Sequence, residues 1–173
     1  QMVNGGPIWK KCFIMTDFNL KMIMPNSNIN NKMKITESNT LPKKKRAIVI
    51  IGAGGIVNDA HLPAYKKANF NVRAIYDIDK KKALHTATLF NIPKVCETLE
   101  DLIEIANKEE CIYDMALPAS AILSVLNSLP DGSSVLIQKP MGDNLQEAKK
   151  ILELCRSKNL LAGINFQLRH APY

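Results

Sequence analysis

Three groups of residues in this chain could do chemistry: a glycine-rich turn, an aspartate and a lysine, each directly after a short apolar run. The first run, Ala47–Ile51, breaks into Gly52, Ala53, Gly54, Gly55 and Ile56. Glycines let a backbone turn sharply and approach a diphosphate closely, and the free N–H groups at the start of the next helix bind anions. We therefore predict that these five residues bind the diphosphate of a dinucleotide.

The aspartate, Asp77, ends the second apolar run, 25 residues after Gly52. A carboxylate there can accept hydrogen bonds from both ribose hydroxyls of NAD and would repel a 2′-phosphate. Ile78 supplies no cation for such a phosphate, so the pattern favours NAD, whereas Lys80–Lys82 leave NADP open. The alternative role for Asp77 is that of a turn or helix-capping residue.

The glycine motif is imperfect, because Val57 occupies the third glycine place of G-x-G-x-x-G. That glycine normally permits close packing of the helix on the strand. Valine there indicates a slightly wider packing rather than a loss of diphosphate binding.

The lysine, Lys139, follows the apolar run Val135–Ile137 in the sequence Gln138-Lys139-Pro140. A residue directly after a parallel strand lies at the carboxyl edge of the sheet, where ligands bind in open α/β folds. We predict that Lys139 is catalytic, holding a substrate hydroxyl or donating a proton as a carbonyl is reduced. An ordinary solvated loop lysine is the alternative.

The elements that must position these residues alternate regularly along the chain. This alternation of strands and helices predicts a Rossmann-type α/β fold, which is a doubly wound parallel sheet with helices on both faces. Pro63 predicts irregular or kinked first turns in the first helix. Strands are predicted at 47–51, 71–76, 94–96, 112–117, 135–137 and 160–166, with helices beginning near 56, 79, 98, 118 and 144.

The net charge of +7 over 173 residues is unevenly distributed. Residues 1–46 hold nine Lys or Arg and two Asp or Glu, whereas 47–173 hold equal numbers of each sign. The neutral part excludes a domain-wide nucleic-acid footprint. We interpret 1–45 as a mostly disordered or loosely packed basic segment, and the basic run 42–46 as a solvated lead-in to the first strand.

The four cysteines have no metal-ligand spacing, so we expect no metal site and interpret them as buried, reduced thiols. Reduced thiols favour a cytoplasmic location. The sequence has no uninterrupted apolar stretch of about 20 residues, so we expect no membrane span. The first residues lack the pattern of a secretory signal.

From Arg46 to Pro172 the chain resembles the Gfo/Idh/MocA oxidoreductases. Four pieces match in order: the glycine turn through Pro63, Asp77, the strand ending in Lys139-Pro140, and the stretch 165–172. The resemblance implies that Lys139 and Pro140 contribute to the cofactor and substrate site and that Leu117 and Pro118 line the cofactor cleft. It also implies that 166–169 cross into a second domain.

The chain departs from the family pattern at two residues. Family members have the sequence Glu-Lys-Pro where this chain has Gln138-Lys139-Pro140, so Gln138 replaces a glutamate. They often have a histidine four residues after the proline that matches Pro118, and this chain has Ile122 there. We assign structural or surface roles to the three histidines, His61, His85 and His170.

The resemblance also implies a substrate-binding domain, with an Asp and a His for proton transfer, that this sequence lacks. We therefore expect three parts: the segment 1–45, an NAD(P)-binding domain at 46–166 and a crossover at 167–173 into a truncated domain. We expect this fragment to be inactive alone and the full-length protein to form a homo-oligomer.

The function expected by resemblance is NAD(P)-dependent hydride transfer to or from a secondary alcohol or ketone, of a sugar, cyclitol or similar polyol. A non-catalytic NAD-binding or redox-sensing module is the alternative. A third hypothesis takes the basic N-terminal segment as a nucleic-acid binder, but we expect a small-molecule substrate and no nucleic-acid partner.

Overall fold

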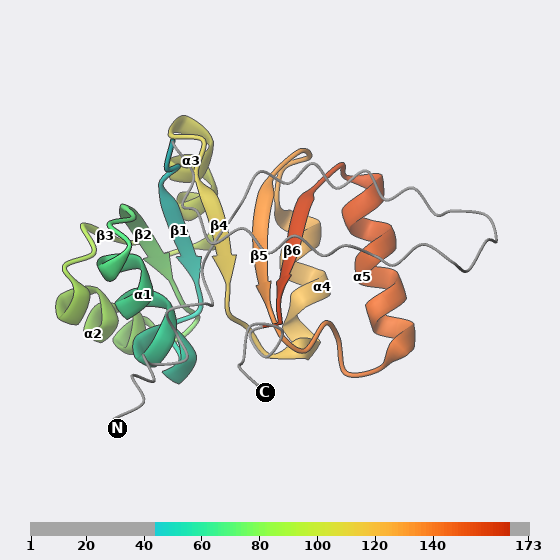
Figure 1. Ribbon diagram of the computed structural model, residues 1–173, viewed down its shortest axis with the longest axis horizontal. Helices are drawn as coiled ribbons and strands as arrows, with labels where there is room; N and C mark the ends of the chain where they lie inside the picture. The colour runs from blue at the N-terminus through green and yellow to red at the C-terminus, as the bar shows by residue number, and fades with distance from the viewer. Residues whose placement is uncertain (1–43, 167–173) are drawn as a thin grey trace, which may run out of the picture.

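A single parallel sheet of six strands forms the centre of the protein in a computed structural model that describes residues 44–166 (Figure 1). The strand order is β3-β2-β1-β4-β5-β6, and every neighbouring pair is parallel. This arrangement confirms the predicted Rossmann-type fold. The strands are β1 Ile48–Ile51, β2 Val72–Tyr76, β3 Lys94–Val95, β4 Ile112–Met115, β5 Ser134–Gln138 and β6 Leu161–Asn165. The expectations for 1–43 and 167–173, including Cys12 and His170, concern residues outside the described range.

Side-chain caps open three of the five α-helices of the described residues. Asp79 caps one helix by accepting hydrogen bonds from two backbone N–H groups, and Asn144 caps another in the same way. Thr98 and Asp101 form a reciprocal capping box. The helices are α1 Leu62–Lys67, α2 Lys80–Phe90, α3 Leu99–Lys108, α4 Ala119–Ser128 and α5 Leu145–Ser157.

The first helix contains a π-helical segment, η2 Val57–His61, directly before α1. This segment confirms the irregular first turns predicted from Pro63, which lies at the start of α1. Proline has no backbone N–H and cannot donate to the preceding turn, so the regular α-helical pattern is interrupted there. Val57 itself is fully buried against the sheet.

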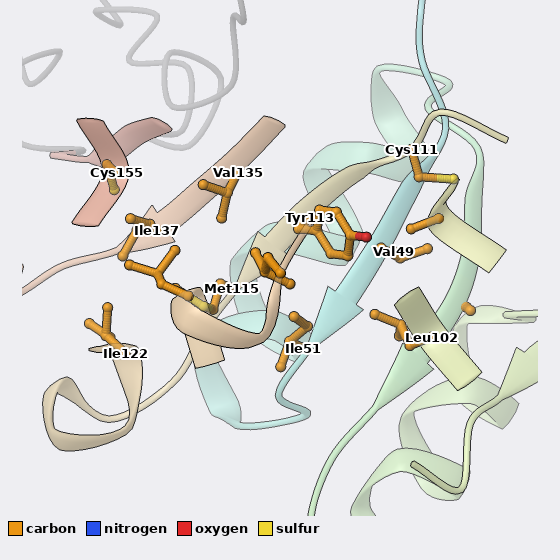
Figure 2. Close-up of a cluster of buried hydrophobic side chains, with 14 of the residues drawn as sticks. Val49, Ile51, Leu102, Cys111, Tyr113, Met115, Ile122, Val135, Ile137 and Cys155 are labelled. Atoms are coloured by element: carbon orange, nitrogen blue, oxygen red, sulfur yellow. The ribbon is translucent and has the colours of Figure 1, made fainter. Parts of the chain in front are cut away.

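Two apolar cores cover the two faces of the sheet. The larger core joins β1, β4 and β5 to α3, α4 and α5, and Figure 2 shows Val49, Met115 and Ile137 pointing into it. The smaller core joins the opposite face of β1 and β2 to η2, α1 and α2. Because each fully buried Ile or Leu stabilises a fold by about 1.5–3 kcal/mol, these cores hold the strand ends in a fixed order.

The strand order reverses direction at β1, which lies between β2 and β4. In open α/β sheets a crevice forms outside the carboxyl ends of the strands at this switch point. The ends of β1 and β4 are tied together there, since the Ala116 N–H donates to the Ile51 carbonyl at 2.9 Å. Within residues 44–166, no helix has both the length and the apolar character that crossing a bilayer requires.

Candidate dinucleotide site at the carboxyl edge of the sheet

The glycine turn lies at the switch point. Gly52 has φ +103°, and a Cβ at this residue would lie 2.4 Å from the Ala116 carbonyl oxygen. A side chain is therefore excluded both by backbone conformation and by the neighbouring strand end. Gly54 and Gly55 are exposed, and a Cβ on Gly54 would meet no atom within 4 Å. The turn is thus closed toward the protein at Gly52 and open toward solvent at Gly54.

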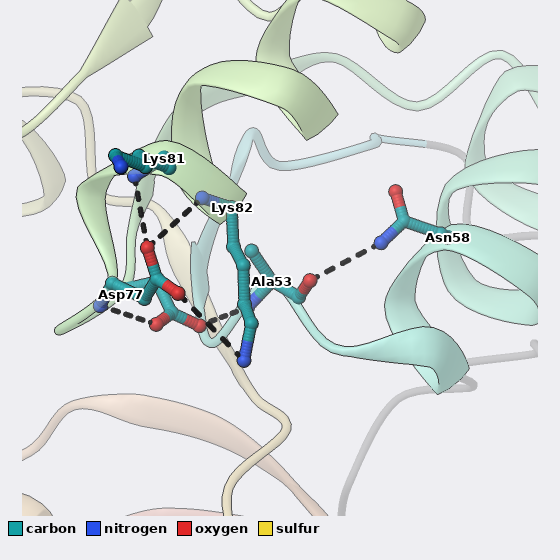
Figure 3. Close-up of polar contacts among 6 residues, drawn as sticks. Ala53, Asn58, Asp77, Lys81 and Lys82 are labelled. Atoms are coloured by element: carbon teal, nitrogen blue, oxygen red, sulfur yellow. Dashed lines mark hydrogen bonds and ion pairs between the residues drawn. The ribbon is translucent and has the colours of Figure 1, made fainter.

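Asp77 fastens this turn to the end of β2. Its Oδ2 accepts a hydrogen bond from the Ala53 N–H at 2.6 Å, and its Oδ1 accepts one from the Asp79 N–H at 2.8 Å (Figure 3). A carboxylate offers about four lone-pair sites, so these two bonds leave each oxygen able to accept another donor. The carboxylate is partly exposed and can reach both the turn and a bound hydroxyl.

The residues beside Asp77 decide what charge surrounds the ribose position. Ile78 is 93% exposed and carries no charge. Lys80 pairs with Glu97, and Lys82 lies 3.9 Å from the Asp79 carboxylate. Two of the three lysines that leave NADP open therefore already have carboxylate partners.

Lys139 follows β5, two strands away from β1 in the sheet. Its side chain is exposed, and its backbone N–H donates to Gln138 Oε1 at 3.2 Å. Gln138 is buried and pairs in register with Asn165 of β6. The Lys139–Pro140 peptide bond is cis.

Leu117 and Pro118 continue from the end of β4, between the turn and Lys139. Leu117 packs toward the glycine turn, since its Cδ2 lies 3.5 Å from the position of a Cβ on Gly52. Pro118 is exposed and precedes the first turn of α4.

All the predicted site residues therefore lie at one edge, along the carboxyl ends of β2, β1, β4 and β5. Neighbouring strands are about 4.8 Å apart, so the ends of β2 and β5, which Asp77 and Lys139 follow, lie roughly 14 Å apart along this edge. A hydrogen bond joins Asp77 to the glycine turn. Among the hydrogen bonds of residues 44–166, none connects Lys139 to Asp77 or to the glycine turn.

The structure fits a dinucleotide at this edge. The open space at Gly54 would let a diphosphate approach the backbone, and the first helical turn begins at Gly55, where a Cβ would lie 3.6 Å from Asp59 Oδ2. The remaining lone pairs of Asp77 suit the two hydroxyls of a ribose.

A buried polar cluster that the sequence alone does not predict lies below this edge. His61 is buried, as a structural role requires, and it contacts the wholly buried Asp114 of β4. Asp114 carries a signal that could have identified it, because a charged residue interrupts the apolar run 112–117. His85, in contrast, lies exposed on α2.

Residues 46–166 match the family model GFO_IDH_MocA, described as an oxidoreductase family with an NAD-binding Rossmann fold. The chain is 32% identical over 113 residues to trans-1,2-dihydrobenzene-1,2-diol dehydrogenase of Mus musculus, covering 64% of this chain and 34% of that protein. It is 29% identical over 135 residues to glucose-6-phosphate 3-dehydrogenase of Bacillus subtilis, covering 74% and 35%.

Among solved structures, the chain resembles the Y186F mutant of KijD10, a 3-ketoreductase from Actinomadura kijaniata in complex with TDP-benzene and NADP. The TM-score is 0.61 at 25% identity, covering 75% of this chain and 39% of that one. The chain spans between 34% and 40% of the length of the curated relatives it matches.

Proposed function

Because the chain belongs to the Gfo/Idh/MocA family of NAD(P)-binding oxidoreductases, we propose that it is the nucleotide-binding half of a dehydrogenase or reductase. The complete protein would move a hydride between a nicotinamide ring and a secondary alcohol or ketone. The observation that carries this proposal is the contact of Asp77 with the Ala53 N–H, which places a carboxylate with spare lone pairs beside an open glycine turn.

The substrate class that we propose is a sugar, cyclitol or similar polyol. Support comes from the names of two relatives, one a dehydrogenase of a cyclic diol and the other a 3-dehydrogenase of glucose 6-phosphate. A structural neighbour is a 3-ketoreductase. All three names imply a hydroxyl or ketone on a secondary carbon.

Each residue at the edge then has a distinct task. The backbone of Gly52, Ala53, Gly54, Gly55 and Ile56 would bind the diphosphate, and Asp77 would accept hydrogen bonds from the adenosine ribose. Leu117, Pro118 and Pro140 would line the cleft, and Lys139 would orient the substrate hydroxyl or move its proton. The nicotinamide ring, when bound, supplies or accepts the hydride, and the protein positions it.

NAD is the cofactor that we propose in preference to NADP. A 2′-phosphate would bring negative charge next to the Asp77 carboxylate. Lys80 and Lys82 face competing carboxylates, and Ile78 cannot pair with a phosphate.

Titration of NADH and NADPH against Asp77→Ala tests the cofactor assignment. We expect the NADH Kd to rise about tenfold or more, because the variant loses hydrogen bonds to the ribose. NADPH affinity should change far less, since a repulsive charge is lost as well. Asp131→Ala is the matched control, because Asp131 lies in the turn before β5 at the opposite edge and pairs with Lys158. Equal NADH affinity in Asp77→Ala and the wild type would refute this role.

Lys139→Met tests the catalytic assignment in the full-length protein. We expect turnover on a panel of sugars and polyols to fall about 100-fold or more, with a far smaller change in NADH affinity. Lys108→Met is the control, because Lys108 ends α3 shortly before β4 begins, at the edge of the sheet opposite to Lys139. A full-length protein that binds NADH yet turns over no polyol would instead support a non-catalytic NAD-binding module.

The proposal divides the chain into an N-terminal segment at 1–45, a cofactor domain at 46–166 and the beginning of a crossover at 167–173. On this division the substrate-selecting part and any homo-oligomer contacts belong to a longer product.

A further inference from the structure

Four polar side chains are buried together beneath the site: His61, Tyr65, Asp114 and Asn165. Their exposed fractions are 1%, 2%, 0% and 8%. His61 Nδ1 lies 2.8 Å from Asp114 Oδ2, and the Tyr65 hydroxyl donates to the same oxygen at 2.9 Å. His61 Nε2 lies 3.5 Å from Asn165 Nδ2.

The carboxylate at the centre of this cluster is costly to bury. Asp114 lies inside a parallel strand, and its Oδ1 has no hydrogen-bond partner within residues 44–166. Burial, together with the charge of Asp114 and the hydrogen bond to it, raises the pKa of Tyr65, so that hydroxyl stays protonated and donates. A buried pair of this kind contributes little net stability, and its best-attested use is to fix a unique arrangement of elements.

The pair of His61 and Asp114 connects the first helix, which follows the glycine turn, to the sheet. His61 is the last residue of the π-helical segment η2, and Asp114 belongs to β4. At the other end of η2, the Asn58 Nδ2 donates to the carbonyls of Ala53 and Gly54 at 3.2 and 3.0 Å. The segment is therefore fastened to the glycine turn by Asn58 and to the sheet by His61.

We propose that His61 is a positioning residue of the dinucleotide site, which acts through Asp114 to hold the η2 segment and the glycine turn attached to it. This inference rests on the proposed function. The contact of His61 with Asn165 extends the same cluster to the residue paired with Gln138, next to Lys139. The cluster therefore connects the helix that follows the glycine turn with the strand pair that ends beside Lys139.

Two conservative substitutions separate this role from simple core filling. An asparagine at residue 61 places its amide nitrogen near the position of imidazole Nδ1 and can still donate to Asp114. A glutamine places its amide near Nε2 and keeps the contact with Asn165 instead. Both are neutral and polar, but asparagine is the smaller and leaves the larger void. A simple loss of packing would therefore harm His61→Asn more than His61→Gln, which is the reverse of the order expected from the contact with Asp114.

The experiment measures NADH affinity and amide hydrogen exchange of 57–60 in His61→Asn and His61→Gln, with the exchange followed in the absence of nucleotide. We expect His61→Gln to bind NADH about tenfold more weakly than the wild type and to exchange these amides faster. His61→Asn should rescue both, with NADH affinity within about twofold of the wild type. His85→Gln is the control, because His85 is exposed on α2.

Equal NADH affinity in the two variants would overturn the proposal, as would a weaker His61→Asn beside an unaffected His61→Gln. If His61→Gln does not fold, Asp114→Asn replaces it, and the same affinity and exchange outcomes decide. A wild-type protein that binds neither NADH nor NADPH would refute the proposed function alone. The exchange rates measured without nucleotide would still judge the link from His61 to η2.

Discussion

Gly52 and Gly54 belong to one motif, yet the structure gives them different physical reasons for being glycine. Gly52 has a positive φ and faces the Ala116 carbonyl, so its constraint comes from the protein itself. Gly54 has an ordinary φ and open space around it, so the protein itself does not require glycine there. On the proposed function, the requirement at Gly54 comes from the diphosphate, and the two residues therefore separate an effect on folding from an effect on binding.

Alanine substitutions at the two glycines should show this separation. Gly52→Ala should lower the free energy of unfolding by about 3 kcal/mol, because it combines backbone strain with a clash against a strand end. Gly54→Ala should change it by less than about 1 kcal/mol, yet raise the NADH Kd about tenfold, because its methyl group would occupy the diphosphate path. Urea denaturation and NADH titration of both variants measure the two quantities. A Gly54→Ala protein with wild-type NADH affinity would contradict a diphosphate at this turn.

At the scale of helices and strands, local signals in the sequence mark where three of the α-helices begin. Asp79, Thr98 with Asp101, and Asn144 each satisfy free N–H groups in the helix that follows, and they do so within three residues of sequence. The alternation of strands and helices then leaves a parallel sheet as the consistent arrangement. The carboxyl-edge placement of Asp77 and Lys139 followed from the same alternation, although their roles stay predictions.

What the sequence could not show depends on contacts between distant residues. The bond between Ala53 and Asp77 joins residues 24 apart, and that between His61 and Asp114 joins residues 53 apart. Pro63 indicated an irregular helix, but it indicated neither the π-helical form nor the contact of the His61 side chain with Asp114 of β4. The sequence shows Asp114 as a charged residue within an apolar run, but it does not show that His61 is its partner.

At the scale of the whole molecule, the larger core connects elements from the first strand to the last helix. It contains the thiols of Cys96, Cys111 and Cys155, all buried and free of disulfide bonds, as the sequence predicted for these three. Burial raises the pKa of each thiol, which keeps it in the protonated and weakly nucleophilic form. A thiol reagent therefore reaches these residues when the core opens.

Labelling of these thiols should report cofactor binding through the stability of the whole domain. In a Cys12→Ser protein, we expect the three core thiols to react slowly and at similar rates, because they share one cooperative core. NADH at about 100 times its Kd should slow labelling about 100-fold, since a ligand that binds only the folded state lowers the population of the open state by that factor. Asp77→Ala at the same NADH concentration should show a much smaller effect. Labelling that NADH leaves unchanged, in a protein shown to bind it, would mean that the thiols are reached through local openings that the cofactor does not oppose.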